Sequence, residues 1–358
     1  MSTGAADRLT ARLPDAGIDV LLVTNLVNVR YLTGYTGSNG IALVGDDTRT
    51  FITDFRYVEQ AAEEVDAAFD RRRSTQHLLE GVEAALGQGD VRLGFEAADM
   101  SVSEHAKLRG LLPSRIELVA TSGLVEELRA VKQPEEVAAI KAAAALADAA
   151  FAQLLSGGLT GRAERDLALE LEYEMRRLGA ERPSFSPIVA AGPHGALPHA
   201  RPRDEPVPAG ELVVIDWGAQ IDGYCSDCTR TVATAAIDGE AREIYQLVLD
   251  AQLAALEEVK PGAVGREVDS VPRAAITAGG HGDHFGHGLG HGVGLEVHEA
   301  PRLSQLSEAV LAPGNVVTVE PGIYIPGHYG VRIEDLVVVT GDGCDILTSI
   351  PKDLTVVD

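Results

Sequence analysis

The chain is poor in cysteine and in aromatic residues, and it lacks the apolar segments that target or anchor a protein. Its 358 residues include three cysteines and one tryptophan, and aromatic residues make up 4%. Three cysteines cannot build a disulfide framework, so we expect a reducing compartment and a cytoplasmic protein. The N-terminus has no apolar core of signal-peptide length, and no apolar run approaches a membrane span.

Positive charge is scarce as well. The 30 lysines and arginines stand against 54 aspartates and glutamates, which gives a formal net charge of −24. This excess argues against nucleic acid and anionic membranes as partners. The acidity is explained most simply as a contribution to solubility.

The length is comfortable for two domains, each large enough to bury a core. The first part alternates apolar runs typical of short strands with segments of helical spacing. The expected strands are 19–24, 41–44, 50–53, 91–95 and 116–119, and the expected helices are 56–65 and 101–111, the second with Ser101 as N-cap. This alternation predicts an α/β domain, which we assign to residues 1–124.

The character of the sequence changes near residue 125. Pro134 followed by Glu135 and Glu136 is typical of a helix start, because proline fits the first turn and acids favour the positive end of the helix dipole. The long helices expected here are 134–155, 163–178, 238–259 and 264–279. With the strands between and after them, they predict an α+β domain over 125–358, whose sheet carries the functional site on its inner face.

Four carboxylates and one histidine in this second domain are the most informative feature of the chain. Each lies within or at the end of a short apolar run, where an isolated charge is costly to bury. Two divalent cations would neutralise four adjacent acids, and oxygen-rich ligation with one imidazole suits ions such as Mn²⁺. A paired-metal site of this kind activates water for hydrolysis. The five residues are Asp216, Asp227, His291, Glu320 and Glu334.

The alternation of side chains along a strand adds two neighbours to this set. In a strand over 331–339, Arg332 and Glu334 share one face, so the arginine would orient a ligand carboxylate. An exposed ion pair on that face is an equally good interpretation. In a strand over 224–232, Thr229 lies on the face of Asp227, close to the expected metal.

Cys225 and Cys228 flank Asp227 with the spacing C-x-x-C, which marks some redox and zinc sites. Residues three apart on a strand face opposite sides. We therefore interpret the spacing as a coincidence.

The tract 286–294 has glycine at every even position, which indicates that another backbone packs closely against one face of a strand. His287 and His291 are four apart, as in the metalloprotease helix H-E-x-x-H, but five glycines in nine residues disfavour a helix. Alternation points these two histidines one way and His298 the other. The chain must therefore bend if His291 and His298 both reach the site. Adventitious metal binding by a histidine-rich loop is the alternative.

These segments, in this order, resemble the metallopeptidase family of aminopeptidase P, prolidase and methionine aminopeptidase, with its pita-bread catalytic fold. The resemblance covers residues 125–358, and the N-terminal 120 residues resemble more loosely the extra domain of the proline-specific branch. The motifs that carry it are VVIDWGA (213–219), YCSDCTRT (224–231), GHGLGHGVGLEVHE (286–299), VTVEPGIY (317–324) and VRIED (331–335), with NVRYLTGYTGSNG (28–40) and TDFRY (53–57) in the first domain.

The resemblance implies a role for each matching position. Asp216, Asp227, His291, Glu320 and Glu334 match the ligands of two divalent metal ions, with Mn²⁺ favoured and Co²⁺ or Zn²⁺ as alternatives. A homodimer is the implied assembly.

The implied catalytic residues are His199, His298 and Glu320. The two histidines match those that steady the tetrahedral intermediate and move protons, and Glu320 matches the base that assists the attacking water. His287, Tyr324 and Arg332 match positions that orient ligands or substrate. The departures from the family pattern, which are Trp217, Cys228 and His284, replace no ligand.

The implied activity is hydrolysis of the bond between an N-terminal residue and proline, in a dipeptide or in a longer peptide. Methionine aminopeptidase shares the ligands but not a 120-residue N-terminal domain, and creatinase-like hydrolases share the fold without the metal acids. A non-enzymatic pita-bread binding module is disfavoured by the complete ligand set. The choice between dipeptidase and aminopeptidase depends on a basic group that caps a dipeptide carboxylate, for which Arg30, Arg56 and Arg332 are candidates.

Overall fold

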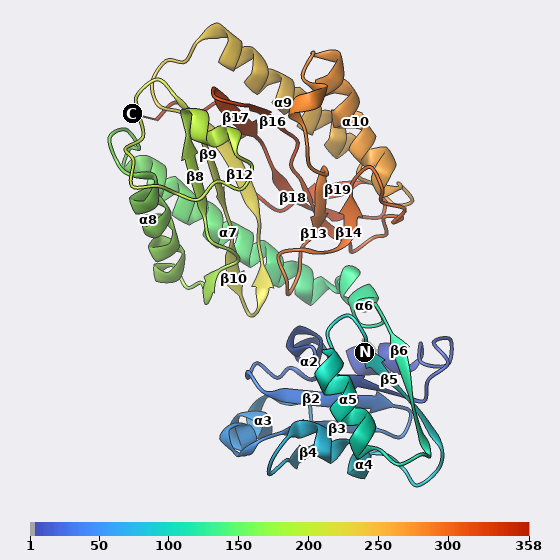
Figure 1. Ribbon diagram of the computed structural model, residues 1–358. Helices are drawn as coiled ribbons and strands as arrows, with labels where there is room; N and C mark the ends of the chain where they lie inside the picture. The colour runs from blue at the N-terminus through green and yellow to red at the C-terminus, as the bar shows by residue number, and fades with distance from the viewer. Residues whose placement is uncertain (1–3, 358) are drawn as a thin grey trace. The chain divides into compact units, whose positions relative to one another are not determined.

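The computed structural model describes residues 4–357 and divides into two compact units (Figure 1). The first unit extends to Arg129 and the second begins at Ala130, so the division falls in the short helix α6 (Glu126–Ala130). Each unit has hydrophobic clusters of its own.

The first unit is built on a six-stranded mixed sheet in the order β4-β3-β2-β1-β5-β6. The pairs β1–β2 and β2–β3 are antiparallel, and the other three pairs are parallel. The strands are β1 (Val20–Val23), β2 (Gly40–Gly45), β3 (Arg49–Thr53), β4 (Asp70–Arg73), β5 (Val91–Glu96) and β6 (Ile116–Thr121). The helices are α1 (Ala5–Thr10), α2 (Leu26–Thr33), α3 (Val58–Glu64), α4 (Val82–Ala85) and α5 (Val102–Leu111).

The strands β1, β2 and β3 of this sheet are buried on both faces, which explains their apolar sequences. In β1, Leu21 and Val23 join one hydrophobic cluster while Val20 and Leu22 join another. The predicted α/β class is confirmed, and Ser101 caps α5 in a capping box with Glu104.

Several elements of the first unit were not predicted. Helices α1, α2 and α4 were missed, and so was β4, whose sequence Asp-Arg-Arg-Arg has no apolar residue. Charged side chains are common on an edge strand, where they discourage pairing with another chain. The helix expected over 56–65 is a 3₁₀ turn, Phe55–Tyr57, followed by α3.

The four long helices predicted for the second unit are present. They are α7 (Pro134–Ser156), α8 (Glu164–Arg177), α9 (Gly239–Glu258) and α10 (Gly265–Ala278). In Figure 1, α7 and α8 lie on one side of the strands and α9 and α10 on the other. The predicted α+β class is therefore confirmed. Trp217 is fully buried under α7, stacked on Phe151 with ring centroids 4.0 Å apart.

The strands of the second unit form four small sheets, β11-β10-β7, β12-β9-β8, β14-β13-β15-β18-β19 and β16-β17. Their bounds are β7 (Arg182–Pro183), β8 (Ile188–Ala191), β9 (Leu212–Trp217), β10 (Ala219–Ile221), β11 (Tyr224–Cys225), β12 (Cys228–Ala233), β13 (Gly290–Gly292), β14 (Glu299–Leu303), β15 (Val316–Val319), β16 (Gly322–Ile325), β17 (Tyr329–Arg332), β18 (Asp335–Val339) and β19 (Cys344–Ile346).

Two continuous strands predicted around the acidic residues are in fact interrupted. The run 224–232 breaks between β11 and β12, and Asp227 lies in the break. The run 331–339 breaks between β17 and β18, and Glu334 lies in that break. Both carboxylates thus sit where the chain leaves one sheet and enters another.

One expectation about apolar length needs correction, because α7 is long and apolar enough to cross a membrane by length and composition alone. The same helix contributes Ile140, Phe151 and Leu154 to the core of the second unit. Its Asp148 accepts hydrogen bonds from the backbone N–H and the hydroxyl of Ser349. A buried core helix can be as apolar as a membrane helix, because both are surrounded by apolar groups.

Candidate metal centre

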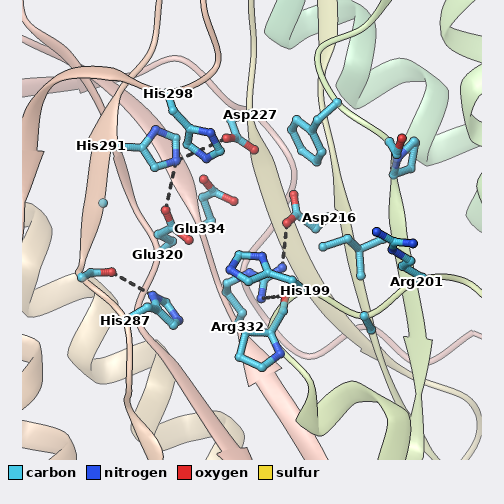
Figure 2. Close-up of a pocket in the computed structure, with 18 of the residues that line it drawn as sticks. His199, Arg201, Asp216, Asp227, His287, His291, His298, Glu320, Arg332 and Glu334 are labelled. Atoms are coloured by element: carbon cyan, nitrogen blue, oxygen red, sulfur yellow. Dashed lines mark hydrogen bonds and ion pairs between the residues drawn. The ribbon is translucent and has the colours of Figure 1, made fainter. Parts of the chain in front are cut away.

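The second unit encloses a cavity of about 750 Å³ into which most of the predicted site residues point (Figure 2). The five expected ligands line it, together with His199, His287, His298 and Arg332. The exception is Tyr324, which is outside the set of described residues that line the cavity. Other lining residues are Phe185, Ser186, Pro187, Ile188, Pro198, Ala200, Arg201, Pro202, Gly288, Gly290, Arg302 and Ser304.

Strands β9 and β12 bring the first two acids together. Asp216 pairs across the ladder with Thr229, and Asp227 precedes β12 at the point where the chain turns into it. One ligand atom each from Asp216, Asp227 and Glu334 lies within 4.8 Å of the others. Acidic side chains from two distant stretches of the sequence, one with Asp216 and Asp227 and one with Glu334, therefore converge on one point.

Threonine hydroxyls hold the two glutamates. Thr229 donates a hydrogen bond from Oγ1 to Oε2 of Glu334 at 2.7 Å. Thr318 donates to Oε1 of Glu320 at 3.0 Å and accepts a hydrogen bond from the backbone N–H of His291. These contacts orient the two carboxylates.

Gly288, Gly290 and Gly292 pack against backbone, as the period of two predicted, whereas Gly286 faces open space and Gly294 faces the Glu299 side chain. A Cβ on Gly290 would lie 2.0 Å from the carbonyl oxygen of Thr318, and one on Gly292 would lie 2.1 Å from that of Ala300. The register of β13 against β14 shifts between His291 and Gly292. This irregularity and the turn that follows supply the bend that the sequence required.

The result of that bend is a histidine pair on the cavity wall. The rings of His291 and His298 are 4.3 Å apart and edge to face. Nε2 of His291 lies 3.6 Å from Oδ2 of Asp227 and 3.3 Å from Oε1 of Glu320. His291 thus joins the acidic group, while His298 faces the cavity beside it (Figure 2).

The crowded carboxylates are electrostatically unfavourable by themselves. Burial and the neighbouring acids raise the pKa of Asp227 and of Glu334 well above their ordinary values, and burial also raises the pKa of Asp216. Burial would do the same to Glu320, but His291, His287 and Arg332 outweigh it and lower the pKa of Glu320 to about 2. Bound cations would relieve the repulsion within this group.

A second observation, which does not depend on charge, indicates that these side chains could bind divalent metal ions. Oδ1 of Asp216 and Oε1 of Glu334 are buried and have no hydrogen-bond partner within the described residues. Buried acceptors without partners are rare, and a water or an ion usually satisfies them. Four carboxylates and one imidazole suit hard or borderline divalent ions.

Arg332 orients a different carboxylate from the one expected. Its side chain is buried and donates from Nη2 to Oδ2 of Asp216 at 2.7 Å, whereas Glu334, which lies in the break after β17, is held by Thr229. The same guanidinium also donates to the hydroxyls of Thr229 and Tyr324. The alternative of an exposed ion pair is therefore wrong.

Tyr324 and His287 contact each other next to the site, and of the two only His287 is among the described residues that line the cavity. The Tyr324 hydroxyl lies 2.9 Å from Nε2 of His287, and Nδ1 of His287 lies 2.8 Å from the carbonyl oxygen of Gly288. Burial lowers the pKa of His287, which favours its neutral form. Desolvation, His291 and Arg302 lower the pKa of His298 to about 4, so this ring is neutral at neutral pH.

Sequence reasoning missed two cationic residues of the cavity, Arg201 and Arg302. Arg201 follows His199 by two positions and Arg302 lies on β14, so their nearness to predicted site residues was the available signal. Of the earlier candidates, Arg56 pairs with Asp54 in the first unit, at 2.8 Å. Cys225 and Cys228 are buried free thiols that belong to different hydrophobic clusters.

Comparison with known protein families places both units. Residues 138–341 match Metallopeptidase family M24, and residues 6–131 match the Creatinase/Prolidase N-terminal domain. The chain is 45% identical over 340 residues to an uncharacterised peptidase of Bacillus subtilis, covering 95% of this chain and 96% of that protein.

Solved structures of similar proteins cover the whole fold. A structure described as an Xaa-Pro dipeptidase from Bacillus anthracis superposes with a TM-score of 0.95 at 42% identity, covering 99% of each chain. A structure described as an X-Pro aminopeptidase from Thermotoga maritima superposes with a TM-score of 0.90 at 37% identity, covering 97% of this chain and 100% of that one. The fold is thus an N-terminal creatinase-type domain followed by a pita-bread catalytic domain.

Proposed function

Because the chain belongs to metallopeptidase family M24, we propose that it is a metal-dependent exopeptidase that hydrolyses the bond between an N-terminal residue and proline. The observation that carries the proposal is the convergence of Asp216, Asp227 and Glu334, two of them with buried oxygens that lack a partner, at the wall of a cavity. His291 and Glu320 complete the proposed ligand set. Mn²⁺ is the proposed metal, and a cytoplasmic homodimer is the proposed form of the enzyme.

The side chains of the cavity divide the chemistry among them. Bound divalent ions supply a water of lowered pKa and polarise the scissile carbonyl. Glu320, which is ionised, accepts a proton from the attacking water. That proton passes on to the departing nitrogen, and His298, which is neutral, can take it up and deliver it there. His199 donates a hydrogen bond to the carbonyl oxygen as it gains charge. Arg332 keeps Asp216 oriented throughout.

The cavity wall suits proline. A bond before proline is a tertiary amide with no N–H, so its recognition depends on shape and apolar contact. Phe185, Pro187, Ile188, Pro198 and Pro202 line the cavity and provide such a surface.

The presence of two arginines in the cavity favours a dipeptide over a longer peptide. Arg201 and Arg302 line the same cavity, and a guanidinium pairs well with a carboxylate. Arg332 is a weaker candidate for this role, because its guanidinium already binds Asp216, Thr229 and Tyr324.

The test is a comparison of four peptides with the metal-loaded protein: Xaa-Pro, Xaa-Pro-Yaa-Zaa, Xaa-Ala and Xaa-Ala-Yaa-Zaa. We expect cleavage of the proline peptides, with the higher kcat/KM on the dipeptide. Equal cleavage of the alanine peptides would contradict the proline specificity. Preference for the tetrapeptide would make the protein an aminopeptidase.

A further inference from the structure

The residues that carry His199 into the cavity form a loop that lies outside the sheets. This segment, 191–203, is called the His199 loop. It leaves β8 at Ala191, makes the 3₁₀ turn Gly192–Ala196, and contributes Pro198, His199 and Arg201 to the cavity wall. Ala191 still pairs with Val213 of β9, but beyond it the position of the loop must be set by contacts other than strand pairing.

A single carboxylate on α8 holds both ends of the loop. Oε1 of Glu164 accepts a hydrogen bond from the backbone N–H of Ala191 at 2.9 Å, and Oε2 accepts one from the backbone N–H of Arg203 at 3.0 Å. The Arg203 side chain adds contacts to both oxygens. Nδ1 of His194 lies 3.0 Å from Oε1 and 2.8 Å from Oε2.

The middle of the loop is tied to the metal centre. Nη1 of Arg332 donates to the carbonyl oxygen of Pro198 at 3.2 Å, while Nη2 of the same residue holds Asp216. The residue that follows Pro198 is His199. Three fixed points, one at each end and one beside the histidine, thus determine its place.

Glu164 is not an ordinary surface acid that contributes only to solubility. Its side chain is 1% exposed, so its charge is withdrawn from water and is satisfied by the loop and by His194. Burial would raise the pKa of Glu164, but hydrogen bonds from Ala191, Arg203 and His194 outweigh it and lower the pKa. The carboxylate is ionised and accepts on both oxygens.

We infer that Glu164 is a positioning residue for the reaction, which sets the location of His199 by holding the two ends of the His199 loop. The inference rests on the proposed peptidase function. Glu164 itself does not touch the cavity among the described residues. Glu164 affects turnover only through the position of His199. A displacement of a catalytic group by about 1 Å is enough to lower a rate by about 10²-fold.

The variant Glu164→Gln tests whether Glu164 acts through its hydrogen bonds or only by filling space. The amide keeps the shape of the side chain but has one acceptor oxygen and one NH₂ group. If the NH₂ replaces Oε1 it faces the N–H of Ala191, and if it replaces Oε2 it faces the N–H of Arg203. In either orientation one of the two backbone hydrogen bonds between Glu164 and the loop is lost.

The first measurement is hydrogen–deuterium exchange of the full-length protein. Glu164→Gln is expected to speed exchange at Ala191 or Arg203 by about 10- to 100-fold, the change that corresponds to the loss of a charge-assisted hydrogen bond. Metal content should equal that of the wild type, because no proposed ligand is altered. Unchanged exchange in the loop would overturn the inference.

The second measurement is a double-mutant cycle with His199→Ala. Glu164→Gln is expected to lower kcat by about tenfold or more in the wild-type background. In the His199→Ala background it should lower kcat by less than about twofold, because the residue it positions is gone. Equal losses in both backgrounds would show a structural role and overturn the inference, even if exchange is faster.

Matched variants control for the loss of a buried charge and of a nearby arginine. Asp148→Asn removes a buried carboxylate from α7, and its effect on kcat should be the same with and without His199. Arg203→Met should reproduce part of the effect of Glu164→Gln. Arg165→Met, which removes an exposed pair with Asp204, should not.

Failure of the proposed specificity is distinguishable from failure of this inference. If the wild type cleaves dipeptides other than Xaa-Pro, the specificity is wrong and the same cycle is measured on the dipeptide that is cleaved. The exchange measurement needs no substrate.

Discussion

Arg332 and Asp216 lie 116 positions apart in the sequence, yet Nη2 of the arginine donates to Oδ2 of the aspartate at 2.7 Å. This contact joins β17 to β9 and makes the arginine part of the support for the proposed metal site. Side-chain alternation alone had paired Arg332 with Glu334. Arg332 binds Asp216, Thr229 and Tyr324 together, which requires the planar, forked guanidinium.

Arg332→Lys should therefore weaken metal binding although it keeps the charge. One ammonium cannot reach three acceptors spread around it, and loss of such supporting contacts costs about 10- to 100-fold in metal affinity. The measurement is competition for Mn²⁺ against a chelating dye. Arg162→Lys, at an arginine that binds Glu170 on α8, is the control and should bind metal like the wild type. Equal affinity of the two variants would contradict the role of Arg332.

Prolonged chelation should abolish peptidase activity, and Mn²⁺ or Co²⁺ should restore it. The reason is that the buried oxygens of Asp216 and Glu334 without partners and the raised pKa values of Asp227 and Glu334 mark a group of acids that requires cations. Metal stoichiometry and kcat are followed together as the metal is returned. Full activity of protein shown to be metal-free would refute the prediction.

Glu320→Gln should remove far more activity than the loss of an ordinary acid. A proton-transfer role alone is worth about 10²- to 10⁴-fold, and Glu320 is also a proposed ligand. Glu243→Gln, at an exposed position of α9, is the control and should leave kcat within about twofold. A loss of less than tenfold for Glu320→Gln, with metal content intact, would count against the assignment.

His298→Ala and His291→Ala should have different effects. His291 lies against Asp227 and Glu320, so its loss should lower metal occupancy. His298 faces the cavity, so its loss should depress kcat while metal content stays nearly unchanged. Both are measured as metal stoichiometry and kcat on one Xaa-Pro dipeptide. Loss of metal from His298→Ala alone would mean that the two roles are exchanged.

Glu96 in the first unit should make stability depend on pH in the direction opposite to most acids. Burial raises its pKa from 4.5 to about 6, in spite of hydrogen bonds from Asn25, Asn28 and Thr24. Between these values the folded protein binds more protons than the unfolded chain, so the free energy of unfolding falls as the pH rises. The contribution is about 2 kcal/mol.

Glu96→Gln should lose this contribution. Urea unfolding of the wild type and the variant at several pH values from 4.5 to 7 checks it. The difference between the two free energies of unfolding should change by about 2 kcal/mol across that range. A difference that is the same at every pH would contradict the raised pKa.

Much of the architecture was predictable from neighbouring residues. Proline and acids at 134–136 marked the start of α7, and apolar runs marked β1, β2, β3, β5 and β6, because helix and strand periods depend on residues close in sequence. Polar β4 and the short helices α1 and α2 lacked such a signal. The five proposed ligands were visible as acids and a histidine in apolar surroundings.

The sequence by itself determined the two fold classes, the glycine face of the 286–294 tract and the residue types of the site, since these follow from composition and local periodicity. Only the tertiary structure decided how the site is assembled. The structure placed Asp227 and Glu334 at breaks between strands. It also joined segments that are distant along the chain, through the contact of Arg332 with Asp216 and those of Glu164 with the His199 loop. Their geometry depends on which strands pair and in which register, and a shift of one residue would turn every side chain to the opposite face.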